Sequence, residues 1–245
     1  TEIDAWVFLP PGDGPVPGLL NIHGGPASQY GHGFFDEFQV YRSAGYAVIA
    51  CNPRGSSGRG RAHTQAVVGD GWGVVDVEDV DAVVAAALHR FPRIDADRLG
   101  IMGGSYGGFL TGWMTAHQDR WKSAVVERAL LGFGSFAGTS DIGATFPLSY
   151  TGADYPDGWD VWWDKSPLSV VHRVTTPTLV LHSEDDHRCP ISEAEQWFMA
   201  LLRNGTETVF LRFPGESHEV SSSGKPRHRR ERFEAIVEWH DRFLK

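Results

Sequence analysis

The stretch from residue 101 to residue 111 constrains the fold more than any other part of the chain. It contains Gly103-Gly104-Ser105-Tyr106-Gly107, which fits the pattern G-x-S-x-G. In this pattern a buried strand reverses sharply into a helix, and the glycines on either side of the serine leave room for that close approach. The serine hydroxyl then stands clear of the sheet, at a helix N-terminus that favours developing negative charge. The pattern predicts a nucleophilic serine, Ser105, although a chance glycine-rich turn would also fit it.

Short apolar runs alternate with amphipathic stretches along the chain. This alternation predicts an α/β fold with a mostly parallel, doubly wound sheet and helices on both faces, as in the α/β-hydrolase fold. No P-loop is present, and no G-x-G-x-x-G opens the first βα unit, so a nucleotide-binding fold is disfavoured. Residues 132–168 interrupt this alternation of apolar and amphipathic stretches. Strands are expected near 5–9, 17–23, 46–51, 99–102, 123–127, 177–182 and 208–213, and helices near 34–44, 76–90, 109–117, 192–204 (opened by a Ser192/Glu195 capping box) and at the C-terminus.

The 245 residues are sufficient for one domain with a substantial core, and we expect a single catalytic domain over residues 1–245. A net charge of −9 argues against nucleic acid as a partner, and the basic run 225–230 is interpreted as solvated surface. Cys51 and Cys189 are too few for a disulfide framework, which favours a cytoplasmic location. No apolar stretch is long enough to cross a membrane. The sequence implies neither metal nor organic cofactor and leaves the oligomeric state, including a homo-oligomer, open.

Two loops that follow late strands carry the remaining polar groups of a catalytic triad. In this fold the order is serine, then an acid, then histidine, each at the carboxyl end of a strand. After the strand near 177–182 come Glu184, Asp185 and Asp186, and spacing alone does not choose among them. After the last strand comes His218, the expected general base, although His187 also lies in the acid loop. The three features in this order predict nucleophilic catalysis.

The stabilisation of a tetrahedral oxyanion needs two backbone N–H donors. One is expected from Tyr106, directly after the nucleophile. The second is expected from the loop His23-Gly24-Gly25-Pro26 that follows an early strand, where glycine lets the backbone approach the substrate oxygen. A simple turn is the alternative interpretation of this loop.

With these pieces assembled, the chain resembles the catalytic domain of the prolyl oligopeptidase family, most closely its acylaminoacyl-peptidase branch. The resemblance implies that Asp186 is the acid, because the family pattern D-x-R-x-P falls on it, and that Gly25 and Tyr106 are the oxyanion donors. The motifs that carry it span nearly the whole chain: His23-Gly24-Gly25-Pro26, Asn52-Pro53-Arg54-Gly55-Ser56, Gly71-Trp72-Gly73, Gly104-Ser105-Tyr106-Gly107-Gly108, Asp186-His187-Arg188-Cys189-Pro190, Glu216-Ser217-His218 and Ser221-Ser222-Ser223-Gly224-Lys225-Pro226.

Two departures from the family pattern stand out. Arg59 occupies a position where an aromatic residue is usual, which puts substrate contacts there in doubt. Members also carry an N-terminal β-propeller that filters substrates by size, and this chain, which opens at Thr1 already close to a strand, contains none of it. We therefore expect the chain to come from a longer parent whose propeller accompanies it, or to act without that filter.

The resemblance implies a serine peptidase that hydrolyses short peptides through an acyl-enzyme and releases N-acylated or N-terminal amino acids. A carboxylesterase of the same fold is the first alternative, since the same triad hydrolyses esters, and a non-catalytic binding scaffold is the second. The specificity pocket is expected within residues 127–163, although plain core packing would explain the same aromatic residues. The candidates are Phe133, Phe136, Phe146, Trp159 and Trp162.

Overall fold

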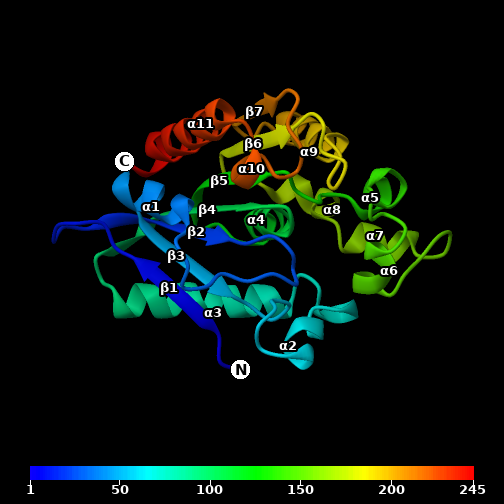
Figure 1. The fold of residues 1–245 in the computed structure, drawn as a ribbon, viewed down its shortest axis with the longest axis horizontal. Helices are drawn as coiled ribbons and strands as arrows, with labels where there is room; N and C mark the ends of the chain where they lie inside the picture. Colours follow the sequence, from blue (N-terminus) through cyan, green and yellow to red (C-terminus); the bar gives the residue numbers. More distant parts are fainter.

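The computed structural model describes all 245 residues and is organised around one seven-stranded sheet (Figure 1). The strand order is β1-β3-β2-β4-β5-β6-β7. Only β1 is antiparallel to its neighbour, so the predicted mostly parallel sheet is confirmed. The strands are β1 (Asp4–Phe8), β2 (Val16–Ile22), β3 (Ala47–Asn52), β4 (Ile94–Gly104), β5 (Trp121–Glu127), β6 (Thr178–Ser183) and β7 (Thr208–Phe213).

Helices cover both faces of this sheet, as the alternating pattern predicts (Figure 1). On one face, α1 (Asp36–Ser43) and α11 (Pro226–Leu244) share a buried apolar cluster with the strands. On the other face, α3 (Val75–Arg90), α4 (Tyr106–His117) and α9 (Ser192–Asn204) contribute to two further clusters. The central strands are buried on both sides, which explains their nearly continuous apolar sequences.

The segment that breaks the sequence rhythm folds into short helices, most of them beyond one end of the sheet (Figure 1). It lies between β5 and β6, and its helices α5 to α7 form a projection beside the carboxyl ends of the strands. The short helical elements of the molecule are α2 (Arg61–Gln65), η1 (Gly69–Gly71), α5 (Phe133–Thr139), α6 (Phe146–Thr151), α7 (Trp159–Asp164), α8 (Pro167–Val170), η2 (Val171–Arg173) and α10 (Val220–Ser223).

The boundaries of α9 confirm one sequence expectation and correct another. The helix ends before Gly205, whose φ of 75° is the left-handed conformation that glycine adopts without strain. The predicted capping box is wrong, because no side chain caps the first turn. Ile191 is already helical, with φ −56° and ψ −23°, so Ser192 lies inside the helix, where it cannot act as its N-cap. None of the helices combines the length and apolar character needed to cross a bilayer.

Candidate active site

Ser105 lies at the sharp turn between β4 and α4. Its φ of 60° and ψ of −121° place a non-glycine residue in a strained region of backbone space. The turn is tight because helix and strand touch: a Cβ on Gly107 would collide with the Ile22 carbonyl, and one on Gly103 would lie 2.6 Å from the Gly107 carbonyl group. The local sequence therefore forms the expected elbow, with the serine at its apex.

His218 and Asp186 are brought together from two separate loops. His218 Nδ1 lies 2.7 Å from Asp186 Oδ2, and the second carboxylate oxygen accepts the backbone N–H groups of Arg188 and Cys189, each at 2.9 Å. Burial by itself would raise the pKa of Asp186, but the hydrogen bonds from the His182 and His218 imidazoles outweigh it and hold this pKa below its ordinary value. The carboxylate therefore stays ionised and orients the His218 ring.

The competing acidic residues of the same loop lie elsewhere. Glu184 is exposed and pairs with Arg212 at 2.9 Å, and Asp185 and His187 are also exposed. Only Asp186 is buried against the histidine. The structure thus favours the acid that the family pattern indicates.

Ser105 and His218 line one cavity of about 320 Å³. No hydrogen bond joins the serine hydroxyl to the imidazole in this structure. Instead, His218 Nε2 lies 3.5 Å from Nη1 of Arg128, a residue that sequence analysis did not single out. Hydrogen bonds between catalytic groups are often loose in the absence of substrate, so the arrangement is compatible with a triad that closes on binding.

The two expected oxyanion donors, Gly25 and Tyr106, line the same cavity. Tyr106 is the first residue of α4, so its backbone N–H has no acceptor within the helix. The glycine loop is fixed by the buried His23, whose Nδ1 lies 2.6 Å from the Gly24 carbonyl and whose Nε2 lies 2.9 Å from Ser56 Oγ. Burial lowers the pKa of His23, which keeps its ring neutral.

Asp76 is a further residue of the site that sequence analysis did not name. Its carboxylate accepts hydrogen bonds from the Tyr106 hydroxyl and from the backbone N–H groups of Gly73 and Val77. Burial raises the pKa of Asp76 to about 6, against the opposing effect of the Tyr106 hydroxyl. Asp76 thereby ties the residue after the nucleophile to the start of α3. The only sequence signal was the acidic helix start after Gly71-Trp72-Gly73.

Half of the 16 residues that line the cavity are apolar. Of the five aromatic residues expected there, Phe136 and Phe146 line it. The expectation is wrong for the other three, because Phe133 is buried against Trp72, and Trp159 and Trp162 line a separate cavity beside α5. The rings of Trp159 and Trp162 pack against each other within the helical projection. The apolar lining that sequence analysis missed consists of Trp72, Phe109, Leu130 and Ile142.

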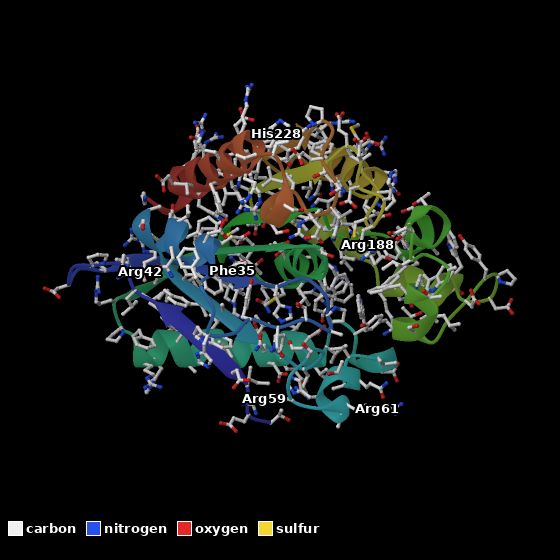
Figure 2. The ribbon with its side chains drawn as sticks, in the orientation of Figure 1. Phe35, Arg42, Arg59, Arg61, Arg188 and His228 are labelled. Atoms are coloured by element: carbon white, nitrogen blue, oxygen red, sulfur yellow. The ribbon has the colours of Figure 1, made fainter.

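Two arginines that sequence analysis singled out lie at different places (Figure 2). Arg188 lines the cavity beside the helical projection, where it bonds to Asp141 at 2.7 Å. Arg59, the departure from the family pattern, bonds to Asp4 next to the N-terminal strand and does not line the cavity. The unusual residue at position 59 therefore leaves the cavity wall unchanged.

Comparison with known proteins places this geometry in a family. A model of the prolyl oligopeptidase family matches residues 32–245. The chain belongs to the prolyl oligopeptidase family. It is therefore a serine peptidase domain of this family, and the resemblance seen in the sequence is confirmed.

Curated relatives of this prolyl oligopeptidase family chain include bacterial and fungal peptidases. An uncharacterized peptidase, YuxL, of Bacillus subtilis is 45% identical over 99% of the chain, which spans 37% of that protein. Dipeptidyl-peptidase 5 of Trichophyton equinum is 31% identical over 100% of the chain, which spans 33% of that protein. The chain thus spans about a third of the length of these relatives.

Solved structures of the family also superimpose on the whole chain. The acylaminoacyl peptidase of Pyrococcus horikoshii matches with a TM-score of 0.96 at 32% identity, over 100% of this chain and 40% of that one. A puromycin-hydrolyzing peptidase of Mycobacterium tuberculosis matches with a TM-score of 0.89 at 30% identity, over 99% of this chain and 37% of that one. These matches confirm the α/β-hydrolase fold.

Proposed function

We propose that this chain hydrolyses short peptides through an acyl-enzyme and releases N-acylated or N-terminal amino acids. The observation that carries the proposal is the position of Ser105, at a strained turn that opens into the same cavity as the Asp186-bonded His218. The similarity to an acylaminoacyl peptidase over the full chain supports the substrate class.

Each residue takes a defined role in this mechanism. Ser105 attacks the carbonyl carbon while His218 Nε2 accepts its proton, and His218 then gives that proton to the leaving amine. Asp186 holds Nδ1 protonated and stabilises the imidazolium. The backbone N–H groups of Gly25 and Tyr106 bind the oxyanion of the tetrahedral intermediate. Water then hydrolyses the acyl-enzyme by the same route.

The aromatic part of the cavity wall supports a preference for a large apolar residue on the acyl side of the scissile bond. Phe136, Phe146 and Trp72 form aromatic walls on the side of the cavity that faces α5 and α6. Burial of an aromatic side chain there contributes roughly 25 cal/mol per Å² of apolar surface removed from water. Substrates with phenylalanine at this position are therefore expected to exceed those with glycine in kcat/KM.

A side-by-side rate comparison tests the proposal. The substrates are an N-acetyl-phenylalanyl anilide and an aryl ester of the same acyl group, each measured with wild-type protein and Ser105→Ala. The replacement should lower turnover of both substrates by about 10⁶-fold, as removal of a triad nucleophile does in other serine peptidases. A loss of only a few-fold would contradict the assignment of Ser105.

A carboxylesterase activity is the alternative, because the same constellation cleaves esters. Cleavage of the ester with no cleavage of the anilide would favour it over the peptidase. Failure of a fluorophosphonate probe to label Ser105 would instead favour a binding scaffold.

A further inference from the structure

Arg128 is a strained and nearly buried cation beside the candidate base. It directly follows β5 and has a φ of 39°, a left-handed conformation that costs a non-glycine residue free energy. Only 15% of its side chain is exposed. Such a conformation persists only where the surrounding structure fixes it, and at functional sites it is a recurring feature.

The guanidinium of Arg128 has N–H donors that are not used in hydrogen bonds. Nη2 donates to Ser221 Oγ at 2.9 Å and Nη1 lies 3.5 Å from His218 Nε2, whereas Nε is buried without a hydrogen-bond partner. The nearest carboxylate oxygen, Oε1 of Glu127, is 3.9 Å from Nε. That carboxylate is already bound through both oxygens to Arg232, at 2.6 Å each. Arg128 therefore carries a positive charge with no carboxylate in hydrogen-bond contact.

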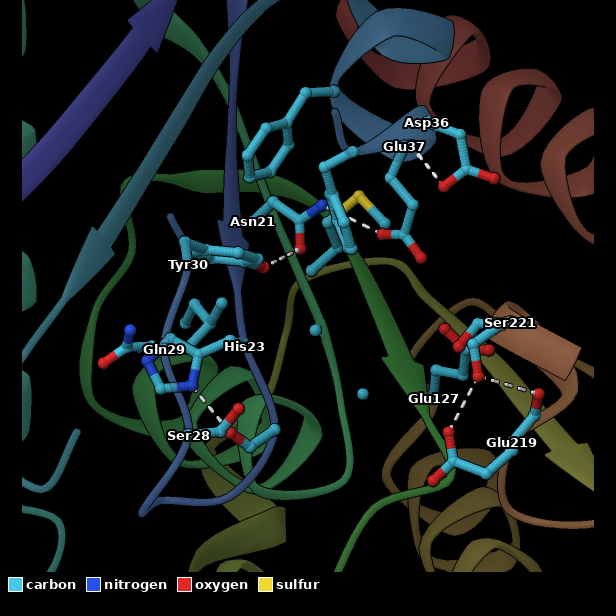
Figure 3. A pocket seen from close by; sticks show the side chains of 18 of the residues that line it. Asn21, His23, Ser28, Gln29, Tyr30, Asp36, Glu37, Glu127, Glu219 and Ser221 are labelled. Atoms are coloured by element: carbon cyan, nitrogen blue, oxygen red, sulfur yellow. Dashed lines mark hydrogen bonds between the residues drawn. The ribbon is translucent and has the colours of Figure 1, made fainter. Parts of the chain in front are cut away.

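Arg128 also separates two cavities. One is the cavity that contains Ser105, and the other, of about 360 Å³, lies toward α1 and α11 (Figure 3). Most of the residues that line the second cavity are polar or charged, among them Asn21 and Glu127. Its volume falls in the range of small-ligand sites, roughly 300–1,000 Å³. Gly24, Ser28, Arg128 and Glu219 line both cavities, so the two are adjacent.

The position of Arg128 matches the place where a leaving residue would carry its carboxylate. A leaving amine that takes the proton from His218 Nε2 lies about 3 Å from that nitrogen. Covalent geometry places the α-carboxylate oxygens of the same residue about 3 to 3.5 Å from its amine. Because Arg128 Nη1 is 3.5 Å from Nε2, such a carboxylate lies within hydrogen-bond reach of it. Each further residue would move the carboxylate about 3.5 Å away.

We propose that Arg128 and the second cavity form a subsite for a leaving amino acid with a free α-carboxylate. Resting on the proposed function, this identifies the substrate class as N-acylated dipeptides, in which the residue after the scissile bond is the last one. The guanidinium binds the carboxylate through two parallel N–H donors, the geometry that arginine provides and lysine does not.

The subsite acts on turnover as well as on binding. Because Arg128 Nη1 lies 3.5 Å from His218 Nε2, a carboxylate held by Arg128 positions the leaving amine beside the proton that His218 donates. Glu219, the exposed carboxylate at the rim, repels the same substrate group weakly, because solvent screens it and its side chain accepts a hydrogen bond from Ser222. The free acid is therefore expected to exceed its amide in kcat as well as in affinity.

Binding to the Ser105→Ala protein tests the subsite without turnover. Isothermal titration compares N-acetyl-Phe-Ala as the free acid and as the C-terminal amide. The free acid should bind about 10- to 100-fold more tightly, as for a hydrogen bond to a charged group. Adding Arg128→Gln should bring the two affinities to within about two-fold, and Arg128→Lys should leave an intermediate ratio. Equal binding of acid and amide by the Ser105→Ala protein would overturn the proposal.

A matched control is Arg188→Gln in the same Ser105→Ala background. Arg188 lines the Ser105 cavity but bonds to Asp141, so its loss should affect acid and amide alike and keep their ratio. Turnover of the two peptides by the protein with Ser105 intact then separates the two proposals. Absence of peptide cleavage with a preserved binding preference would refute the proposed function and leave the subsite standing. Equal cleavage and equal binding would refute the subsite alone.

Discussion

Asp186 is fixed from several directions at once. Two backbone N–H groups of its own loop hold Oδ1, while the imidazoles of His218 and His182 lie 2.7 and 3.5 Å from Oδ2. Because the backbone donors belong to the turn that carries the carboxylate, its position does not depend on His218 or on substrate. The rotamer of His218 is therefore set by a preorganised acceptor.

Replacement of Asp186 by asparagine tests whether Asp186 orients the His218 ring. Asp186→Asn presents an amide that can donate to Nδ1 and so favours the wrong tautomer of His218. We expect kcat to fall by about 10⁴-fold, the size seen for this replacement in another serine peptidase. Asp185→Asn, in the exposed neighbour, is the control and should stay within about two-fold. Comparable losses in both variants, measured on the aryl ester, would argue against Asp186 as the acid.

Residues that belong to a short sequence motif could be predicted from the sequence. Residues whose role comes from a contact with a distant part of the chain could not. Ser105 follows from a five-residue pattern, and His218 follows from its place after the last strand. Spacing alone left three candidate acids, the resemblance to the family indicated Asp186, and in the structure only Asp186 of the three is buried. Arg128 gave no signal, because its importance comes from a contact with a residue 90 positions away.

At the scale of elements, the elbow depends on contact between backbone atoms of β2, β4 and α4. Gly107→Ala would place a methyl group on the Ile22 carbonyl, and a backbone neighbour cannot move aside as a side chain can. We expect a loss of about 2–4 kcal/mol in the free energy of unfolding, measured by urea denaturation. Gly14→Ala is the control: an added Cβ there meets nothing within 4 Å, so stability should change by less than about 0.5 kcal/mol. Similar values for both variants would refute the contact argument.

Helix α11 is joined to the sheet and to α1 by a buried ion cluster. Arg232 donates to both oxygens of Glu127 at 2.6 Å and to Glu37 at 2.8 Å. Arg232→Met would leave two buried carboxylates without their cation, and we expect it to cost about 3–5 kcal/mol of unfolding free energy. Arg230→Met, on the same helix but in an exposed pair with Glu234, should cost less than about 0.5 kcal/mol. Chemical denaturation of the two variants measures the difference, and a cost below about 1 kcal/mol for Arg232→Met would contradict the prediction.

Elements with strong periodicity were predictable, and details that depend on tertiary contacts were not. Every strand expected from an apolar run is present, and strands such as β3 and β6 are apolar because both of their faces are buried. The capping box at Ser192 failed because Pro190 and Ile191 lead the chain into the helix earlier. Trp159 and Trp162 were wrongly expected to line the Ser105 cavity, because the sequence of an aromatic-rich segment does not indicate which ring faces a cavity.

For the molecule as a whole, the buried Asp76 makes stability depend on pH. Its pKa of about 6 in the folded state lies above the ordinary 3.8 of the unfolded chain, so folding favours the protonated form. The stabilisation is complete below the unfolded value and is lost as pH rises through 6. When the pH is raised from about 5 to about 7.5, ionisation of Asp76 should lower the free energy of unfolding by about 1 kcal/mol.

Asp76→Asn provides the comparison for this prediction. Asparagine does not titrate, so the difference in unfolding free energy between wild type and variant should shrink by about 1 kcal/mol from pH 5 to pH 7.5. Urea denaturation at both pH values measures it. A difference that is constant with pH would show that Asp76 is ionised throughout.

The cytoplasmic location, the accompanying propeller and the homo-oligomer stay predictions.

Ser105 and His218, the proposed nucleophile and base, are attached to different parts of the sheet. Ser105 follows the central strand β4, whereas the His218 loop follows β7, the outermost and partly exposed strand. That loop is attached to α11 mainly through Glu216, which bonds to His228 at 2.6 Å and to the Lys225 backbone at 3.1 Å. On warming, the edge of a sheet opens locally before its centre. The enzyme should therefore lose activity reversibly some degrees below the temperature at which its core melts, and should regain it on cooling.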